Sequence, residues 1–335
     1  MIMIKLYFIP IALLYILFNV SIVYAENIDS RSEFIFYMEE KHGFDRQELN
    51  LLFDQTIVSQ SILNAIKRPA EKKLSWHQYR EIFIKKKRIE QGVQFWLDNQ
   101  SKLKEAEEKF GVPPEIITAI IGVETYYGKN SGRYRVIDSL NTLAFHYPKR
   151  AAFFRSELEH FLLFSREQNF NPEELKGSYA GAMGMPQFIS SSYRNYAIDF
   201  DNDSVADIWN NPNDVIGSVA NYFFEHGWKN KAPIITKVIV KGDQYKKILD
   251  NNLELNIYES DLEEIGIQYN STFQDNEKLK LFEFRLEHGS EYWLAQNNFY
   301  VITRYNHSKL YAMAVYQLAL EIKDHKNKNA NILEN

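Results

Sequence analysis

The stretch GVPPEIITAIIGVETYYG, residues 111–128, decides the fold that we expect around it. Its two prolines favour a helix start, because proline is tolerated in the first helical turn. Ile117, Ile120 and Ile121 recur at helical spacing, which predicts an apolar stripe along one face. Gly128 is typical of a left-handed cap, so we expect the helix to end there.

One carboxylate interrupts this apolar stripe. Glu124 follows Ile121, Ile120 and Ile117 by three, four and seven residues, and it therefore shares their face near the helix end. Loss of water there disfavours the charged form, as a general acid working near neutral pH requires. The alternative is a glutamate at the edge of the stripe whose tip bends into water or pairs with a basic side chain.

A loop of small residues follows at 177–184, with the sequence GSYAGAMG. Three glycines and two alanines in eight residues would let the backbone approach a ligand closely. Ser178 and the later Gln187 could bind sugar hydroxyls or an acetamido group, although a tight loop packed on a helix would look the same.

Aromatic residues are unusually common, with 23 Phe, 21 Tyr and 5 Trp, or 49 in 335 residues. Aromatic faces stack on sugar rings, so a saccharide cleft would account for part of the excess and core packing for the rest. The candidates near the loop are Tyr126, Tyr127, Tyr193, Tyr196, Trp209, Tyr222 and Trp228.

Composition excludes several classes of function. There is no cysteine, which excludes disulfides, thiolate metal sites, a cysteine nucleophile and a lipid anchor carried on cysteine. The net charge of −5 argues against a nucleic-acid binder that relies on a basic field. An ordinary charged fraction of 25% excludes wholesale disorder.

The changing character of the chain predicts an α+β protein that is mostly α. Residues 1–25 have the layout of a signal peptide, or of an uncleaved N-terminal anchor, which predicts an exported, periplasmic protein. The expected parts are a helical domain at 26–110, a catalytic core at 111–232, a small β domain at 233–302, and a return segment with a C-terminal helix at 303–335. Within them, residues 234–242 and 278–287 predict strands, 310–322 predicts a helix, and the polar tail 323–335 is expected to be frayed.

Several motifs together resemble the lytic murein transglycosylase B family. They are IGVETYYG at 121–128, GAMGMPQF at 181–188, GSVANY at 217–222, TRYNHS at 303–308, KHGF at 41–44 and RPAEK at 68–72. These motifs occur in the family's order from residue 41 to 308, so the resemblance covers most of the chain. Two departures are Met185, where a polar or aromatic residue is more usual, and Ser190, where proline is common.

The resemblance implies a lysozyme-like core that cleaves the β-1,4 bond between N-acetylmuramic acid and N-acetylglucosamine in peptidoglycan, leaving 1,6-anhydromuramic ends. Glu124 matches the family's single acid and base, and no cofactor is required for the chemistry. Ser178 and Asn306 match residues around the acetamido group, while Gln187, Tyr222 and Tyr305 match other residues of the cleft. The implied partners are peptidoglycan glycan strands, and cell-wall synthesis or remodelling proteins are further candidates. A lysozyme-like muramidase that uses water and a non-catalytic murein-binding scaffold are the alternatives.

A second set of carboxylates predicts a structural calcium site. Asp199, Asp201 and Asp203 occupy positions 1, 3 and 5 of a loop in which the carbonyl of Val205 is available at position 7. The family often binds calcium here, and Asp214 stands at the position of its closing acid. Position 6 is Ser204 instead of glycine and position 12 is Asn210 instead of glutamate, so an Asp-rich turn that caps a helix is the alternative. Nothing in the sequence resembles a zinc site.

Overall fold

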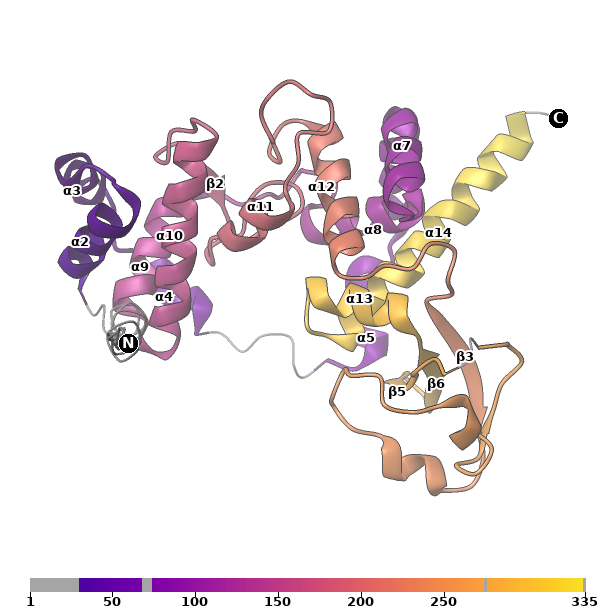
Figure 1. The fold of residues 1–335 in the computed structure, drawn as a ribbon. Coiled ribbons are helices and arrows are strands. Elements are labelled where there is room, and N and C mark those ends of the chain that lie inside the picture. Colours follow the sequence, from indigo (N-terminus) through magenta and orange to yellow (C-terminus); the bar gives the residue numbers. More distant parts are fainter. Residues whose placement is uncertain (1–29, 68–73, 274–275, 334–335) are drawn as a thin grey trace, which may run out of the picture.

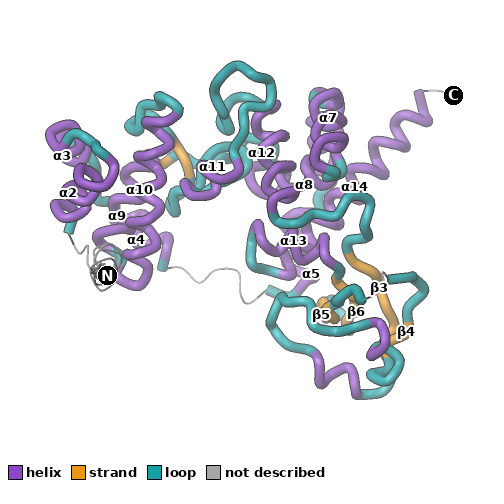
Figure 2. Tube along the Cα trace, viewed as in Figure 1, coloured by secondary structure: helices purple, strands orange, loops and turns teal. Residues whose placement is uncertain are grey.

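The computed structural model describes residues 30–67, 74–273 and 276–333, and most of these residues are helical (Figures 1 and 2). The helices before the β module are α2 (Arg31–His42), α3 (Arg46–Asp54), α4 (Gln60–Ile66), α5 (Trp76–Phe83), α6 (Lys86–Asp98), α7 (Gln100–Phe110), α8 (Pro114–Thr125), α9 (Val136–His146), α10 (Ala151–Glu167), α11 (Ser190–Tyr196) and α12 (Pro212–Glu225). Two helices follow it, α13 (Asn297–Tyr305) and α14 (Lys309–Leu333). The predicted α+β class, made mostly of helices, is confirmed.

The helices form two groups joined by α11 and α12 (Figure 1). At one end, α2, α3 and α4 lie with α9 and α10, and at the other end α5, α6 and α7 lie with α8 and α14. The helices expected as one domain at 26–110 therefore contribute to both groups. The domain boundaries drawn from the sequence stay predictions.

A four-stranded antiparallel sheet forms the β module in the order β4-β3-β6-β5. Its strands are β3 (Ile235–Val240), β4 (Ile267–Gln268), β5 (Lys280–Arg285) and β6 (Ser290–Ala295), and a two-stranded ribbon elsewhere joins β1 (Tyr134–Arg135) to β2 (Lys176–Gly177). The strands predicted at 234–242 and 278–287 are confirmed as β3 and β5. A second apolar cluster that includes Val238, Leu262, Leu281 and Leu294 gives the module its own small core.

The polar tail does not fray where we expected it to. Helix α14 continues to Leu333, well past the predicted end at residue 322. Lys323 pairs with Glu115 at 2.7 Å, and the Lys326 ammonium lies 4.9 Å from the centre of the Trp96 ring. These contacts fix side chains that look freely solvated in the sequence, so the prediction of a frayed tail from residue 323 was wrong.

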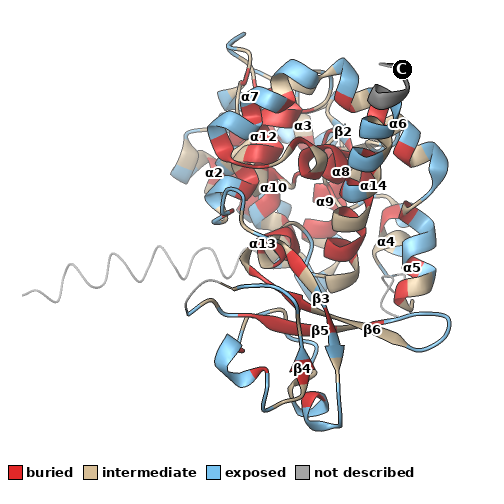
Figure 3. Ribbon diagram, turned by 90° about the vertical axis from the view of Figure 1, so that its right-hand side faces the viewer, coloured by how far each residue is buried: buried red, intermediate tan, exposed pale blue. Residues whose placement is uncertain are grey.

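Most of the helical core is one continuous apolar cluster, and Figure 3 shows buried residues concentrated on α8, α9 and α14. Ile117, Ile120 and Ile121 of α8 are all fully buried, which confirms the predicted stripe. No helix within the described part of the chain is both long and apolar enough to cross a membrane. The predicted signal or anchor at 1–25 lies outside the described residues, and so does the RPAEK motif at 68–72.

Candidate active site

Helix α8 ends directly after Glu124. Pro113 is the N-cap and Pro114 the first helical residue, as expected, but the helix ends at Thr125 and not at Gly128. Tyr126, Tyr127 and Gly128 all have positive φ, at 56°, 60° and 83°. A left-handed conformation is unfavourable for tyrosine, so neighbouring contacts must hold these residues in it.

Space for the Tyr127 ring is made by glycine. The Tyr127 hydroxyl donates to the backbone oxygen of Arg88 at 2.9 Å. A Cβ atom at Gly122 would lie 2.6 Å from that hydroxyl oxygen and 2.7 Å from the ring carbon that carries it, and a Cβ atom at Gly92 would lie 2.5 Å from the same oxygen. Gly122 therefore allows the turn that follows Glu124.

Thr125 joins the helix end to the small-residue loop. Its hydroxyl donates to the Met185 carbonyl at 2.9 Å and accepts the Gly128 N–H at 3.0 Å. Tyr305 makes a second contact with the same loop, donating to the Pro186 carbonyl at 2.7 Å. These bonds bring the ends of α8 and α13 to one loop.

Glu124 accepts a hydrogen bond from Tyr311, which the sequence did not point to. The Tyr311 hydroxyl lies 2.6 Å from Glu124 Oε1 and belongs to the first turn of α14. Burial, followed by the nearby charge of Glu124, raises the pKa of Tyr311 well above its ordinary value, so the phenol stays protonated and donates. The partners are 187 residues apart, and no local pattern marks such a pair.

Tyr305 lies next to Tyr311 with its ring nearly parallel, at a centroid distance of 6.5 Å and an interplanar angle of 10°. Burial and then the charge of Glu124 raise the pKa of Tyr305 well above its usual value. Tyr222 packs against Tyr305 at 4.8 Å and donates to the Arg304 carbonyl at 2.8 Å. Since only 7% of Tyr222 is exposed, it lies beneath Tyr305 as a support.

The small-residue loop is rigidly bonded to itself. Ser178 Oγ accepts the N–H groups of Ala180 and Ala182, at 3.3 and 3.0 Å, which leaves its own proton free to be donated. Gln187 has a φ of 53°, and its side-chain amide donates to the carbonyls of Ser131 and Gly184. The Gln187 side-chain oxygen is thereby turned away from these two carbonyls.

Asn306 directly follows α13 and is exposed. It lies between Tyr305 and the start of α14, so its side chain is accessible at the edge of the residues around Glu124.

Several aromatic residues that we interpreted as a sugar-stacking surface belong to the core. Tyr193 and Trp228 are only 3% and 7% exposed. Their polar atoms donate to the carbonyls of Ala206 and Gly111, at 2.7 and 3.0 Å. Because their faces are covered by protein, these two rings explain part of the aromatic excess by packing.

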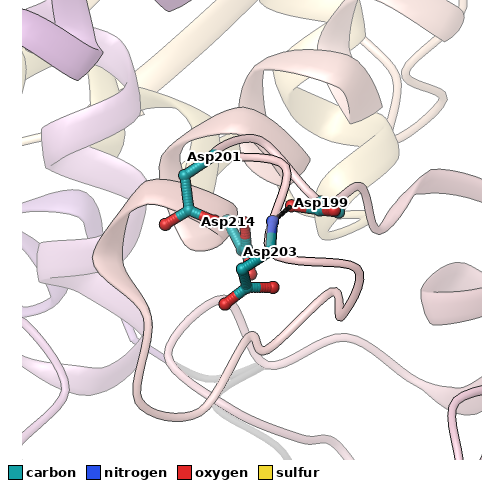
Figure 4. Close-up of side chains that lie close together, drawn as sticks. All are labelled: Asp199, Asp201, Asp203 and Asp214. Atoms are coloured by element: carbon teal, nitrogen blue, oxygen red, sulfur yellow. Dashed lines mark hydrogen bonds between the residues drawn. The ribbon is translucent and has the colours of Figure 1, made fainter.

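The four aspartates of the predicted calcium loop converge (Figure 4). One carboxylate oxygen from each of Asp199, Asp201, Asp203 and Asp214 lies within 4.8 Å of the others. The turn bends at Ser204, whose φ is 81°, so serine takes the conformation for which the calcium loop normally uses glycine.

The donor set fits a hard divalent cation. Burial, together with the charges of Asp201 and Asp199, raises the pKa of Asp214 to about 6. The hydrogen bonds that Asp214 accepts from the N–H groups of Phe200 and Asp207 act in the opposite direction but are outweighed. Asp201 Oδ1 is inaccessible to water and has no hydrogen-bond partner within the described part of the chain. Calcium prefers oxygen ligands of this kind and would neutralise the clustered charge.

Comparison with known proteins places these features in a family. Residues 29–320 match the transglycosylase SLT domain family. Membrane-bound lytic murein transglycosylase B of Escherichia coli K12 is 41% identical over 308 residues, covering 87% of this chain and 82% of that protein.

Two solved structures are similar along nearly their whole length. Soluble lytic transglycosylase SltB1 from Pseudomonas aeruginosa has a TM-score of 0.85 and 47% identity, covering 88% of this chain and 99% of that one. Lytic transglycosylase Slt35 of Escherichia coli, solved in complex with calcium, has a TM-score of 0.81 and 39% identity, covering 90% of this chain and 93% of that one. The chain therefore belongs to the transglycosylase SLT domain family and is a lytic transglycosylase.

Proposed function

We propose that this protein cleaves the β-1,4 bond between N-acetylmuramic acid and N-acetylglucosamine in peptidoglycan and leaves 1,6-anhydromuramic ends. The observation that carries the proposal is the hydrogen bond from Tyr311 to Glu124 Oε1 at the end of α8. It holds the carboxyl group of Glu124 in one orientation at the end of the helix.

One carboxyl group suffices for both halves of this reaction. Protonated Glu124 gives its proton to the glycosidic oxygen as the bond to the anomeric carbon breaks, while the acetamido group of the substrate shields that carbon. The carboxylate then takes the proton of the C6 hydroxyl as O6 bonds to the anomeric carbon. Because the substrate supplies the second group, the scheme joins the substrate-assisted exceptions to the two-carboxylate rule.

Tyr311 contributes to this cycle through its proton. A phenol whose pKa is raised remains a donor throughout, so it stabilises the carboxylate that forms when Glu124 has given up its proton. A hydrogen bond to a charged group contributes about 1.5–3 kcal/mol.

The other site residues take roles around this acid. The free proton of Ser178 and the exposed amide of Asn306 are suited to the acetamido group. Gln187 and Tyr305 border the sugar, and Tyr222 acts through Tyr305 as a positioning residue.

Glu124→Gln tests the assignment directly. We expect clearance of a murein suspension to fall at least about a hundredfold, because the amide cannot exchange the proton. The matched control is Glu108→Gln on the exposed face of α7, which should act like the wild type. Mass spectrometry of the wild-type products should show anhydromuramic ends.

The same assay separates the two alternatives. Hydrolysed ends without anhydro ends would make the protein a muramidase that uses water. Unchanged clearance by Glu124→Gln would remove the acid from the mechanism. If the wild type binds murein without cleaving it, the protein is a non-catalytic murein-binding scaffold.

We also propose that the loop binds a structural calcium ion through Asp199, Asp201, Asp203 and Asp214, with the carbonyl of Val205. Calorimetric titration should show one site, and calcium at a hundred times its Kd should stabilise the fold by about 2.7 kcal/mol. Asp203→Asn should weaken both effects, while Glu225→Gln, on the exposed side of α12, should not. A melting temperature that is the same with calcium and with chelator would contradict this proposal.

Export to the periplasm is a further part of the proposed function. It rests on the layout of residues 1–25, with the protein either released by cleavage or held by the uncleaved segment. Mass measurement of the mature protein recovered from a periplasmic fraction tests it, since cleavage after Ala25 predicts Glu26 as the first residue. Recovery of the protein only from the cytoplasm would contradict it.

A further inference from the structure

The hairpin at residues 183–188 continues directly into helix α11, which lies between α10 and α12 (Figure 1). Met183 and Phe188 close this hairpin through two backbone hydrogen bonds, at 2.8 and 3.0 Å. Thr125 and Tyr305 donate to its Met185 and Pro186 carbonyls, which fixes its turn to the ends of α8 and α13. Its second strand leads into α11, so the position of that strand depends on how the start of α11 is held.

A buried carboxylate from another helix holds the start of α11. The N-cap residue of α11, Ile189, has an apolar side chain that cannot accept a hydrogen bond from the first turn. Glu157 of α10 supplies the acceptor instead. Its Oε2 accepts the Ser191 N–H at 2.9 Å, and its Oε1 accepts the Ser191 hydroxyl at 2.8 Å. Because Glu157 is only 5% exposed, water has little access to compete for these bonds, and they fix α11 to α10.

These bonds make the hairpin a bridge between the two helix groups. Glu157 belongs to α10 in one group, and Thr125 ends α8 in the other. Gln187 lies between these anchors, with its side-chain amide bonded to the Ser131 and Gly184 carbonyls at 3.1 and 3.0 Å. A movement of α11 relative to α10 must therefore be taken up by the hairpin, and Gln187 moves with it.

We propose that Glu157 is a positioning residue for the reaction, which holds Gln187 in place by clamping Ser191. The inference rests on the proposed place of Gln187 beside the sugar. Glu124 and Tyr311 make their hydrogen bond between α8 and α14, without a contribution from α11. Loss of the Glu157 clamp should therefore weaken substrate binding and leave proton transfer largely intact, which predicts a change in KM rather than in kcat.

Steady-state kinetics on soluble murein glycan fragments test this role. Glu157→Gln keeps the size of the side chain, but its amide nitrogen cannot accept a hydrogen bond, so at least one bond to Ser191 is lost. We expect KM to rise about fivefold and kcat to stay within about twofold of the wild type, as the loss of one hydrogen bond allows. Ser191→Ala removes only the hydroxyl and should also raise KM, so it provides the test if Glu157→Gln does not fold.

Glu159→Gln is the matched control on the same helix. Glu159 is also partly buried and hydrogen-bonded, but its partners His42 and Lys41 belong to α2 and not to α11. This variant should lower the melting temperature and leave KM unchanged. Circular dichroism and melting temperature first establish that each protein is folded at the temperature of the assay.

A double variant tests whether Glu157 acts through Gln187. Gln187→Ala alone should raise KM, because it removes the side chain that borders the sugar. Adding Glu157→Gln should then raise KM little further, since both changes remove the same contact with substrate. Two residues that act independently would instead show fold-changes that multiply.

The proposal is overturned if folded Glu157→Gln and Ser191→Ala both keep the KM of the wild type. It is also overturned if Glu159→Gln raises KM as much, if the fold-changes multiply in the double variant, or if kcat falls while KM stays constant. Failure of the proposed function is a separate result, because it shows in the wild type as a digest without anhydro ends.

Discussion

Tyr311 donates its hydroxyl proton to Glu124 Oε1 across 2.6 Å, linking the first turn of α14 to the last turn of α8. Glu124 is on the apolar face that the sequence predicts, but its partner comes from the far end of the chain. The side chain of a general acid has to be held in one orientation to be useful, and this bond supplies that restraint.

Removing the phenol oxygen tests the restraint. Tyr311→Phe should lower kcat about 10- to 100-fold, because a hydrogen bond to a charged group contributes about 1.5–3 kcal/mol and each 1.4 kcal/mol is a factor of ten. Steady-state kinetics on murein fragments measure it. Tyr316→Phe, on the same helix, is the control and should keep its rate. A wild-type rate in folded Tyr311→Phe would leave the hydrogen bond without a catalytic role.

The link between helix and loop gives a second prediction. Thr125→Val removes the donor to Met185 and the acceptor of Gly128, and should destabilise the protein by about 1–3 kcal/mol while lowering kcat. Thr118→Val is a close control, since Thr118 is fully buried on the same helix and its hydroxyl has no partner among the residues that the structure describes. Equal urea midpoints for the two variants would show that the link does not matter.

Gly122 should not tolerate a methyl group. In Gly122→Ala the new Cβ would lie 2.6 Å from the Tyr127 hydroxyl oxygen, so the Tyr126–Tyr127 turn must move or the helix must bend. Overpacking of this kind costs about 1–3 kcal/mol. We expect lower activity as well as a lower melting temperature, because the turn follows Glu124 directly. Gly43→Ala adds a methyl group that would meet nothing within 4 Å, so any loss of stability there comes from the positive φ of Gly43, which Gly122 does not share. Full activity in Gly122→Ala would show that the turn can shift harmlessly.

Acid sensitivity should arise partly from Glu159. Burial alone would raise the pKa of its carboxyl group, but hydrogen bonds from His42, Lys41 and Tyr37 outweigh burial and lower it. A pKa that is lower in the folded state stabilises the fold above the unfolded value of about 4.3, and the contribution disappears as the pH falls through the folded value.

The comparison is between the wild type and Glu159→Gln over a range of pH. The wild type should be more stable by about 1–2 kcal/mol near pH 6, and the difference should shrink below about pH 4. Glu81→Gln, an exposed residue of α5, should show no such pH-dependent difference. A difference that grows toward low pH would reverse the assigned sign.

Local sequence patterns predict much of this fold because the spacing of apolar residues follows which side of a helix or strand is buried. The isoleucine stripe of α8 faces the core, so its helical period is visible without a structure, and the buried Leu281, Phe282 and Phe284 mark β5 by their apolar character. The end of α8 was placed wrongly because Tyr126 takes the left-handed cap, with Tyr127 held by Arg88, a contact 39 residues away.

Long-range partners explain the rest of what the sequence left out. The tail looked frayed because Lys323 and Lys326 carry charge, and their partners Glu115 and Trp96 belong to other helices. The bond from Tyr311 to Glu124 depends on how α14 packs against α8. Residue spacing within one segment does not indicate which distant elements will pack together.

Because Tyr311 lies far after Glu124 in the chain, the site can be completed only late in synthesis. An emerging polypeptide can form α8 with Glu124 long before α14 exists, and its acid then lacks the phenol that orients it. Full activity should therefore report completion of the chain. A product that ends before residue 309 should be inactive, because it lacks both the Tyr311 phenol and the buried face of α14 that packs on α8.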